Sequence, residues 1–363
     1  LFRQYGELTR VDASKRAGIS MPSVLKAIQP FVDAGILVPM GEASAPLGRR
    51  PLLLRFNPDA IAAYGIEFEG DRLSVGLVRI DGSIEKQVAL RVRHSFDDDL
   101  VRSILSGLEA LGASGTPGSP ATPGGRRLAG IGIGIPGAVD PARQLIRFAP
   151  LIGVHEPTDA APILRQVEAA TGLPVFMEND ANVAAVGEYL LRGEADPDAR
   201  GDLLFVSLGT GLGGGLILDG ALHRGAHFLC GELGYYSPEP GAQASTREQG
   251  WLESRLNVAA LEARFGPMDA WPVRDEALLA AIADPLAPAL ANTATILDID
   301  RIVLGGVVVD RLGAPLVDRI RDATNRLALH RLDISPVASE DPGIVGAATL
   351  VIESRLDDLV AME

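Results

Sequence analysis

A short run of polar residues between two apolar segments is the part of the sequence best suited to bind a ligand. Residues 173–177 predict a buried strand, and residues 183–189 continue as a helix rich in Ala and Val. Four polar residues stand between them: Glu178, Asn179, Asp180 and Asn182. Because α/β folds place ligands at the carboxyl ends of strands, these amides and carboxylates predict a site for a hydroxyl-rich ligand. The alternative is a helix N-cap formed by Asn179 or Asp180.

Composition narrows the class of protein. A chain of 363 residues, 47% of them hydrophobic, predicts two or three domains with sizeable cores. No uninterrupted apolar run reaches the roughly 18 residues of a membrane span, and the first residues carry no signal-peptide pattern. The single cysteine, Cys230, excludes an internal disulfide and a cysteine-based zinc site. We therefore expect a soluble, cytoplasmic protein without a membrane partner.

The charge is unevenly distributed along the chain. Residues 1–57 contain eight Lys and Arg against four Asp and Glu, a net charge of +4. Because the whole chain has a net charge of −14, residues 58–363 carry −18. A basic head on an acidic body indicates that only the head approaches phosphate.

The head has the pattern of a winged helix-turn-helix. Residues 8–17 predict a first helix, Gly18 a turn, and Ser20 the N-cap of a second helix that ends near Ala34. Pro22 suits the first turn of that helix, whereas Pro30 is expected to kink it.

Two strands, residues 36–38 and 52–56, are predicted to form the wing, and the loop between them ends in two arginines. In this arrangement the second helix enters the major groove and the wing contacts the backbone or the minor groove. The alternative is a protein-binding helix-turn-helix with solvated arginines. The DNA-contact candidates are Ser20, Met21, Ser23, Lys26, Arg49 and Arg50.

The body begins with strands at residues 64–68, 73–80 and 84–92, followed by a helix at 100–111, a Gly- and Pro-rich surface insertion at 113–127 and a strand at 128–135. The first hairpin turn carries Glu67, Glu69 and Asp71. Three carboxylates repel a polyphosphate unless a metal intervenes. This turn is interpreted either as a solvated acidic turn or as a metal site.

A second hairpin follows the strand at residues 203–208 and holds five glycines within residues 209–215. The glycines indicate either an anion-binding nest of backbone N–H groups or a tight turn that needs positive φ. Residues 287–297 and 315–327 predict helices on either side of a strand at 301–304.

With these motifs in place, the sequence resembles the ROK family (repressors, open reading frames, kinases), in its branch with a winged helix-turn-helix ahead of a sugar-kinase-like body. The resemblance rests on residues 178–182, Gly187-Glu188, residues 209–215, 231–234, 303–306 and 343–348. It implies an α/β fold with a two-lobed actin-like ATPase body. The expected division is a DNA-binding domain at 1–57, a first lobe at 58–186 to which 345–363 returns, and a second lobe at 187–344.

The resemblance also implies a ligand site. The positions that hold a hexose in the family's kinases are occupied here by Asn179, Asp180, Glu232 and Glu253, with Tyr235 in place of a histidine. The Asn of the family's Pro-Asn-Leu segment is missing after Pro150. The cysteines of the family's zinc motif are absent from residues 244–253, so no metal and no other cofactor is expected. Packing of Trp251 against Tyr235 is the expected substitute for zinc.

These expectations combine into a repressor of carbohydrate-related genes that binds operator DNA and a sugar-like effector as a homodimer or homotetramer. The resemblance implies Asp-x-Gly-x-Thr at the first hairpin turn of a kinase, where it holds phosphate and metal, whereas residues 67–71 here are Glu-Phe-Glu-Gly-Asp. Kinase activity is therefore not expected; Asp180 would be the base in a kinase. The alternatives are a sugar kinase that carries a DNA-binding head and a ligand-free DNA-binding scaffold.

Overall fold

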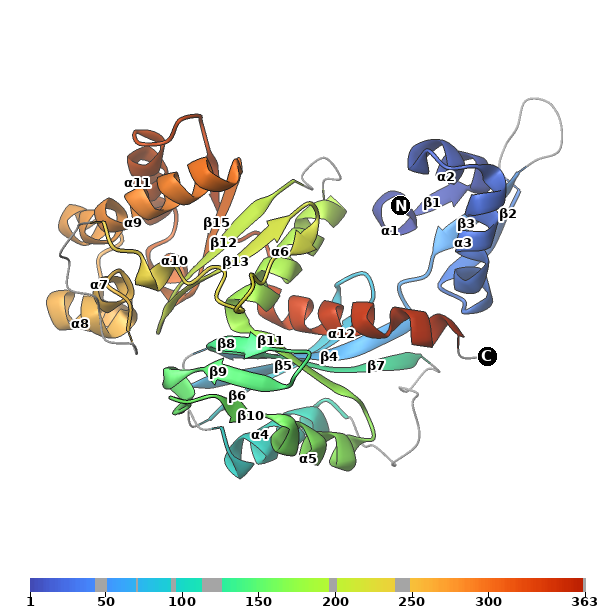
Figure 1. Cartoon of the computed structure of the whole chain (residues 1–363), viewed down its shortest axis with the longest axis horizontal. Helices are drawn as coiled ribbons and strands as arrows, with labels where there is room; N and C mark the ends of the chain where they lie inside the picture. Colours follow the sequence, from blue (N-terminus) through green and yellow to red (C-terminus); the bar gives the residue numbers. More distant parts are fainter. Residues whose placement is uncertain are drawn as a thin grey trace.

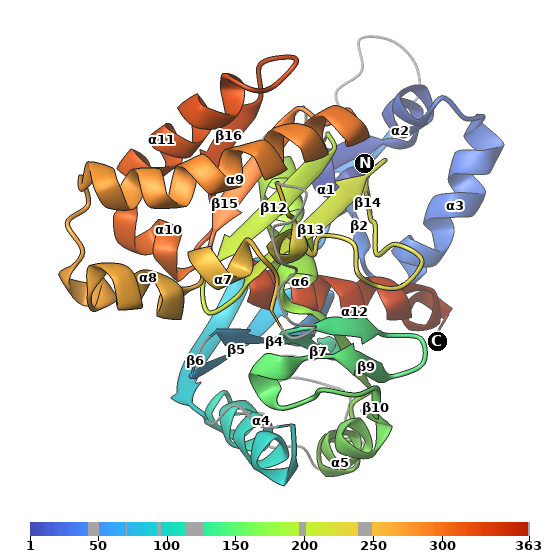
Figure 2. The same cartoon turned by 60° about the vertical axis from the view of Figure 1, so that its left-hand side comes forward.

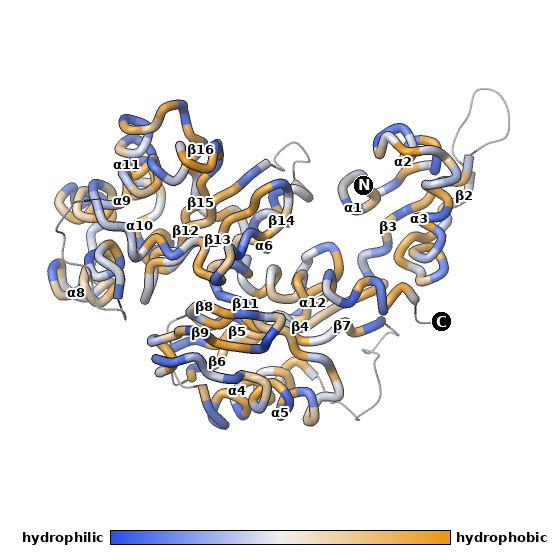
Figure 3. The backbone as a smooth tube through the Cα atoms, viewed as in Figure 1, coloured by the Kyte–Doolittle hydropathy of each residue, from blue (hydrophilic) through white to orange (hydrophobic). Residues whose placement is uncertain are grey.

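The chain folds into a small head and two α/β lobes joined by two long helices, as the computed structural model shows (Figure 1). The structure describes residues 1–42, 51–69, 71–92, 96–112, 126–195, 201–238 and 249–361. The orange, hydrophobic residues in Figure 3 lie along central strands such as β12 and β15, where the cores form.

The head is a winged helix-turn-helix. Its antiparallel sheet has the strand order β1-β3-β2. The elements of the head are α1 (Phe2–Tyr5), β1 (Glu7–Thr9), α2 (Arg10–Ala17), α3 (Met21–Asp33), β2 (Leu37–Glu42) and β3 (Leu52–Phe56). Its small core consists of Ala13, Val24, Ile28, Leu37 and Leu54. The turn, the Ser20 cap and the two wing strands are confirmed.

One prediction about the head helices was wrong. The first helix begins at Arg10, because Leu8 pairs with Leu54 in the sheet and the Thr9 side chain accepts a hydrogen bond from the Asp12 N–H at 3.1 Å as the N-cap. The second helix contains Pro30 and ends at Asp33 with Ala34 as its C-cap, as predicted. The loop tip with Arg49 and Arg50 lies outside the described residues.

The first lobe is built on a five-stranded sheet with the order β11-β7-β4-β5-β6. Strands β4, β7 and β11 are parallel, and β5 and β6 add antiparallel hairpins. Helices α4 and α5 cover the face away from the second lobe (Figure 1). The elements are β4 (Ile61–Glu69), β5 (Arg72–Arg79), β6 (Ile84–Arg91), α4 (Asp98–Ala110), β7 (Arg127–Ile135), α5 (Ala161–Thr171) and β11 (Val175–Asn179). A side sheet holds β8 (Ala138–Asp140), β9 (Leu145–Phe148) and β10 (Thr158–Asp159).

The second lobe repeats the plan with the strand order β14-β13-β12-β15-β16. Helices α9 and α11 lie side by side on its outer face (Figure 2). Its strands are β12 (Leu203–Leu208), β13 (Leu212–Leu218), β14 (Ala221–Leu222), β15 (Arg301–Gly305) and β16 (Asp333–Pro336). Its helices are α7 (Glu253–Leu256), α8 (Val258–Phe265), α9 (Glu276–Leu297), α10 (Val307–Leu312) and α11 (Ala314–Asn325).

Helix α9 is the one helix within the described ranges that is long and apolar enough to cross a membrane. More than half of its apolar window is buried, and Leu278, Ile282, Leu286 and Leu290 are inaccessible or nearly so. Its composition is therefore that of a core helix.

Two helices cross between the lobes. Helix α6 (Asp180–Ala195) spans the predicted lobe boundary at 186–187, and α12 (Pro342–Ala361) lies on β4 and β7 of the first sheet. Their backbones approach closely, because a Cβ on Gly346 would lie 1.7 Å from the Val183 carbonyl oxygen. The domain boundaries remain predictions.

We expect Gly132→Ala to destabilise the body. A Cβ at Gly132 would lie 1.9 Å from the carbonyl oxygen of Ala347 in α12, and backbone cannot move aside as a side chain can. Overpacking of this kind costs about 3 kcal/mol in the free energy of unfolding. The measurement is urea denaturation, with Gly201→Ala as the control. A Cβ on Gly201 would meet no atom within 4 Å, and the φ of Gly201 lies outside the left-handed region that favours glycine. Equal stabilities of the two variants would contradict the assigned packing.

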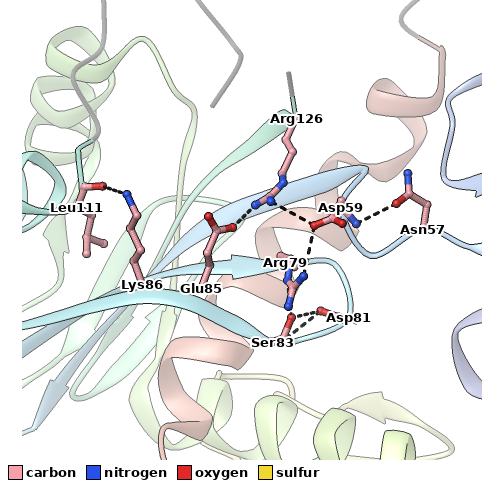
Figure 4. Close-up of polar contacts among 9 residues, drawn as sticks. All are labelled: Asn57, Asp59, Arg79, Asp81, Ser83, Glu85, Lys86, Leu111 and Arg126. Carbon is pink, nitrogen blue, oxygen red and sulfur yellow. Dashed lines mark hydrogen bonds and ion pairs between the residues drawn. The ribbon is translucent and has the colours of Figure 1, made fainter. Parts of the chain in front are cut away.

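The linker between head and body is fixed by polar contacts (Figure 4). Asn57 donates to the Gly35 carbonyl at 3.0 Å, and its own side-chain oxygen accepts from the Asp59 N–H at 3.2 Å. The Asp59 carboxylate then pairs with Arg79 at 3.3 Å and with Arg126 at 3.2 Å. The end of α3 is thereby tied to the sheet of the first lobe.

Candidate ligand cavity and DNA-binding head

A cavity of about 920 Å³ opens between the two lobes. Residues of β4, β11, β12, β15 and the turns that follow them line it. Among its lining residues are all five that the sequence predicted for the ligand: Asn179, Asp180, Glu232, Tyr235 and Glu253. The structure therefore brings together side chains up to 74 positions apart, from Asn179 to Glu253. Their role in ligand binding stays a prediction.

Asn179 serves as the helix cap that the sequence left open. Its side-chain oxygen accepts from the Asn182 N–H at 2.9 Å, at the start of α6. Its amide nitrogen donates to the Gly137 carbonyl at 2.9 Å and to the Asp180 carboxylate at 3.0 Å. Because both its oxygen and its nitrogen have partners, Asn179 is better suited to orient Asp180 than to hold a ligand alone.

Glu178 belongs to the predicted polar run, but the sequence did not reveal that its side chain is buried and paired. Its side chain is fully buried and pairs with Arg224 at 2.6 Å. It also accepts from the Asn182 side chain at 3.0 Å and from the Asn179 N–H at 2.9 Å. The Glu178 carboxylate therefore holds Asn179 and Asn182 in place and connects them to the second lobe through Arg224.

Three carboxylates lie close together in the cavity: Asp180, Glu232 and Glu253. Burial, followed by repulsion from Asp180 and Glu253, raises the pKa of Glu232 to about 7. Burial also raises the pKa of Glu253, opposed by hydrogen bonds from the backbone of Leu212 and Gly250. At neutral pH, Glu232 thus exists in both forms and can donate to a hydroxyl or accept from one.

The raised pKa predicts a pH-dependent stability. The ordinary pKa of a glutamate is 4.5, so between pH 4.5 and about 7 the folded chain holds a proton on Glu232 that the unfolded chain has released. Stability is then lost as pH rises through this window, by at most about 3 kcal/mol. We expect Glu232→Gln to match the wild type near pH 4.5 and to exceed it in melting temperature at pH 8. A difference that stays constant with pH would contradict this assignment.

The loop that precedes Glu253 is joined to the Glu232 turn by backbone contacts. The Leu252 N–H donates to the Gly234 carbonyl at 2.9 Å, and a Cβ on Gly250 would lie 1.9 Å from that oxygen. Trp251 stacks with the guanidinium of Arg255 at 3.9 Å, while Tyr235 is 41% exposed in the cavity wall. Within the described ranges, no group of three or more His, Cys, Asp or Glu could hold a metal ion.

The glycine-rich hairpin serves close packing. Gly213 to Gly215 belong to β13 and pair with β12, and none of the glycines at 209–215 adopts positive φ, which corrects the tight-turn expectation. A Cβ on Gly215 would lie 2.5 Å from the Ala181 carbonyl oxygen. These glycines therefore let the start of α6, with Asp180, approach the second sheet.

The cavity has further acidic residues in its wall. Glu67 lies against the first turn of α12, because a Cβ on Gly343 would lie 2.0 Å from its carboxylate oxygen. Glu340 and Asp341, which directly precede α12, also line the cavity, and Asp310 on α10 is a further acidic residue of the lining. Asp71 is exposed, while the side chain of Glu69 and all of Gly70 lie outside the described residues.

In the head, three of the six DNA-contact candidates are exposed: Ser20, Ser23 and Lys26. Met21 is partly buried, and Arg49 and Arg50 are not described. Ser20 caps α3, accepting from the Ser23 N–H at 3.4 Å. Leu25, expected on the buried face of α3, is 38% exposed. Lys15 and Arg16, at the exposed end of α2, add cations that the sequence analysis did not single out.

Fold and cavity together define a sugar-kinase-like body of the actin-like ATPase class that carries a winged helix-turn-helix. The profile of the ROK family matches residues 63–354, and the chain belongs to that family. A ROK family transcriptional regulator, a homologue of the E. coli MLC protein, superposes with a TM-score of 0.73 at 21% identity over 97% of this chain and 93% of its own.

Relatives of both kinds share the sequence. The putative xylose repressor of Caldicellulosiruptor sp. (strain Rt8B.4) is 29% identical over 63% of this chain, a match that spans only 54% of the repressor. The glucokinase of Thermotoga maritima is 26% identical over 80% of this chain and 96% of its own length. The family thus includes both repressors and sugar kinases.

Proposed function

We propose that the chain is a cytoplasmic transcriptional repressor of carbohydrate-related genes, whose head binds operator DNA and whose cavity binds a sugar-like effector. It acts as a homodimer or homotetramer, so that two heads contact two half-sites. The winged helix-turn-helix and the repressors among its relatives support this function.

The observation that carries the proposal is the path of helix α12. Pro342, in its first turn, lines the cavity, and its last turns pack against the head. Leu359 is 4% exposed there and belongs to one hydrophobic cluster with Ile36 of the head, which is 3% exposed. One rigid helix of 20 residues, about 30 Å long, thus connects effector site and DNA-binding domain.

Helix α6 provides the second part of this connection. It begins at Asp180 in the cavity and crosses α12 where Gly187 and Gly346 bring the backbones together. A ligand that binds one arrangement of the lobes more tightly shifts the protein toward that arrangement. Because α6 and α12 are in backbone contact, movement of the lobes displaces the surface on which the head rests.

A sugar kinase is the second candidate, favoured by the place of Asp180 in the cavity, where a kinase would hold its general base. Glu67, Asp310, Glu340 and Asp341 oppose it, since they repel a triphosphate. In the repressor, Asp180 accepts a hydrogen bond from a sugar hydroxyl without transferring a phosphoryl group.

The test uses the full chain and DNA selected by it from a random pool. We expect a sugar from a panel of hexoses and pentoses to raise the melting temperature and to change the Kd for the selected DNA at least tenfold. The Leu359→Ser variant should bind sugar and, without sugar, DNA as tightly as the wild type. Sugar should no longer change its Kd for the selected DNA. Sugar phosphate formed from ATP and Mg²⁺ would contradict the repressor proposal in favour of a kinase.

A further inference from the structure

Two leucines in the cavity wall are largely exposed to solvent. Leu151, in the turn after β9, is 42% exposed, and Leu229, in the loop after β14, is 51% exposed. One comes from each lobe, and Pro150 and Pro157 line the wall with them. Exposed leucines inside a ligand cavity indicate apolar surface that a ligand can cover.

The leucine of the first lobe lies beside a predicted sugar-binding carboxylate. A Cβ placed on Gly211 would be 2.9 Å from Glu253 Oε1 and 3.6 Å from Leu151 Cδ1. Glu253 Oε1 accepts a hydrogen bond from the Leu212 N–H at 3.3 Å and can also accept one from a ligand hydroxyl, whereas the methyl group is best covered by an apolar group. A ligand that satisfies both atoms carries hydroxyls and an apolar group side by side.

Two arginines line the cavity, Arg72 on β5 and Arg147 on β9. Arg147 is a cation of the lining, but it already pairs with the buried carboxylate of Asp140 at 3.3 Å and lies over the Phe228 ring at 5.3 Å. Leu151 also occupies the position after Pro150 where the motif noted in the sequence has an amide. At Leu151 the wall is therefore apolar.

The size of the cavity agrees with a ligand larger than one sugar ring. Its volume of about 920 Å³ lies near the upper end of the roughly 300–1,000 Å³ typical of sites for drug-sized ligands. The end near Glu340 and Asp341 is acidic, so the apolar side of the cavity is the better place for a neutral extension of the sugar.

We propose that the effector is a glycoside with an apolar aglycone, an alkyl or aryl group. The sugar hydroxyls bind Asp180, Glu232 and Glu253, and the aglycone packs against Leu151 and Leu229. This inference rests on the proposed sugar-sensing function and names the class of its effector.

The test compares matched probes by titration calorimetry on the full chain: glucose and xylose, their methyl glycosides and their phenyl glycosides, in both anomers. We expect a phenyl glycoside to bind at least tenfold more tightly than its methyl counterpart. Leu151→Asn should bring that ratio close to one while the free sugar still binds. Leu327→Asn is the matched control, because Leu327 is a 58% exposed leucine outside the cavity lining, and its ratio should equal that of the wild type.

The outcomes separate this inference from the function on which it rests. If free sugars bind as tightly as phenyl glycosides, or if the ratio survives in Leu151→Asn, the glycoside class is wrong and sugar sensing stands. If phenyl glycosides bind but Asp180→Asn does not weaken them, the binding is nonspecific and the inference fails. If no probe binds, both proposals fail. Because Leu151 is 42% exposed, its variant should melt near the wild-type temperature, which thermal denaturation checks.

Discussion

An Asp180→Asn variant should lose the rise in melting temperature that a sugar gives the wild type. The Asp180 carboxylate lines the cavity and is held by the Ala181 N–H at 2.8 Å and by the Asn179 amide at 3.0 Å. Hydrogen bonds to a charged group contribute about 1.5–3 kcal/mol each. Loss of two of them to sugar hydroxyls weakens binding about 100-fold or more, measurable by calorimetry.

A second readout accompanies that loss. Asp180 raises the pKa of Glu232 by repulsion, so removal of its charge should bring the Glu232 pKa down toward its ordinary value. The loss of stability between pH 4.5 and 7 should become smaller in the variant. Asp310→Asn serves as the control, because Asp310 lies on α10 beside Gly305 and Gly306, and its sugar response should persist. A sugar response retained in Asp180→Asn would remove this aspartate from the site.

Arg224→Ala should be among the most destabilising substitutions in the body. It removes the ion-pair partner of Glu178, a fully buried carboxylate, at a place where Asn179 and Asn182 supply only two neutral hydrogen bonds. An uncompensated buried charge costs about 3–5 kcal/mol in the free energy of unfolding. Urea denaturation measures this cost.

Two further variants make the interpretation specific. Arg355→Ala breaks a surface pair with Asp358, which is 68% exposed, and should change stability by less than about 1 kcal/mol. A double variant, Glu178→Gln with Arg224→Ala, removes the buried charge together with its partner and should be more stable than Arg224→Ala alone. If the double variant is the less stable of the two, Arg224 acts through packing and not through charge.

The sequence by itself determined the winged helix-turn-helix, the main strands and helices of the body and the position of Asp180 at the cavity. These features depend on local signals: Ser20 is a side-chain cap, Gly18 supplies a left-handed turn, and the apolar strand before Asp180 carries that residue to the edge of a sheet. Such signals operate over a few neighbouring residues, so they can be read without the fold.

Only the tertiary structure decided which distant segments meet. Leu8 is a strand residue because it pairs with Leu54, and Glu178 can be buried because Arg224 reaches it from the other lobe. In the same way, α12 joins cavity and head through contacts made by residues near both of its ends. Contacts between residues tens or hundreds of positions apart leave no periodicity or spacing in the chain, and their energies come from packing and charge pairing that exist only after folding.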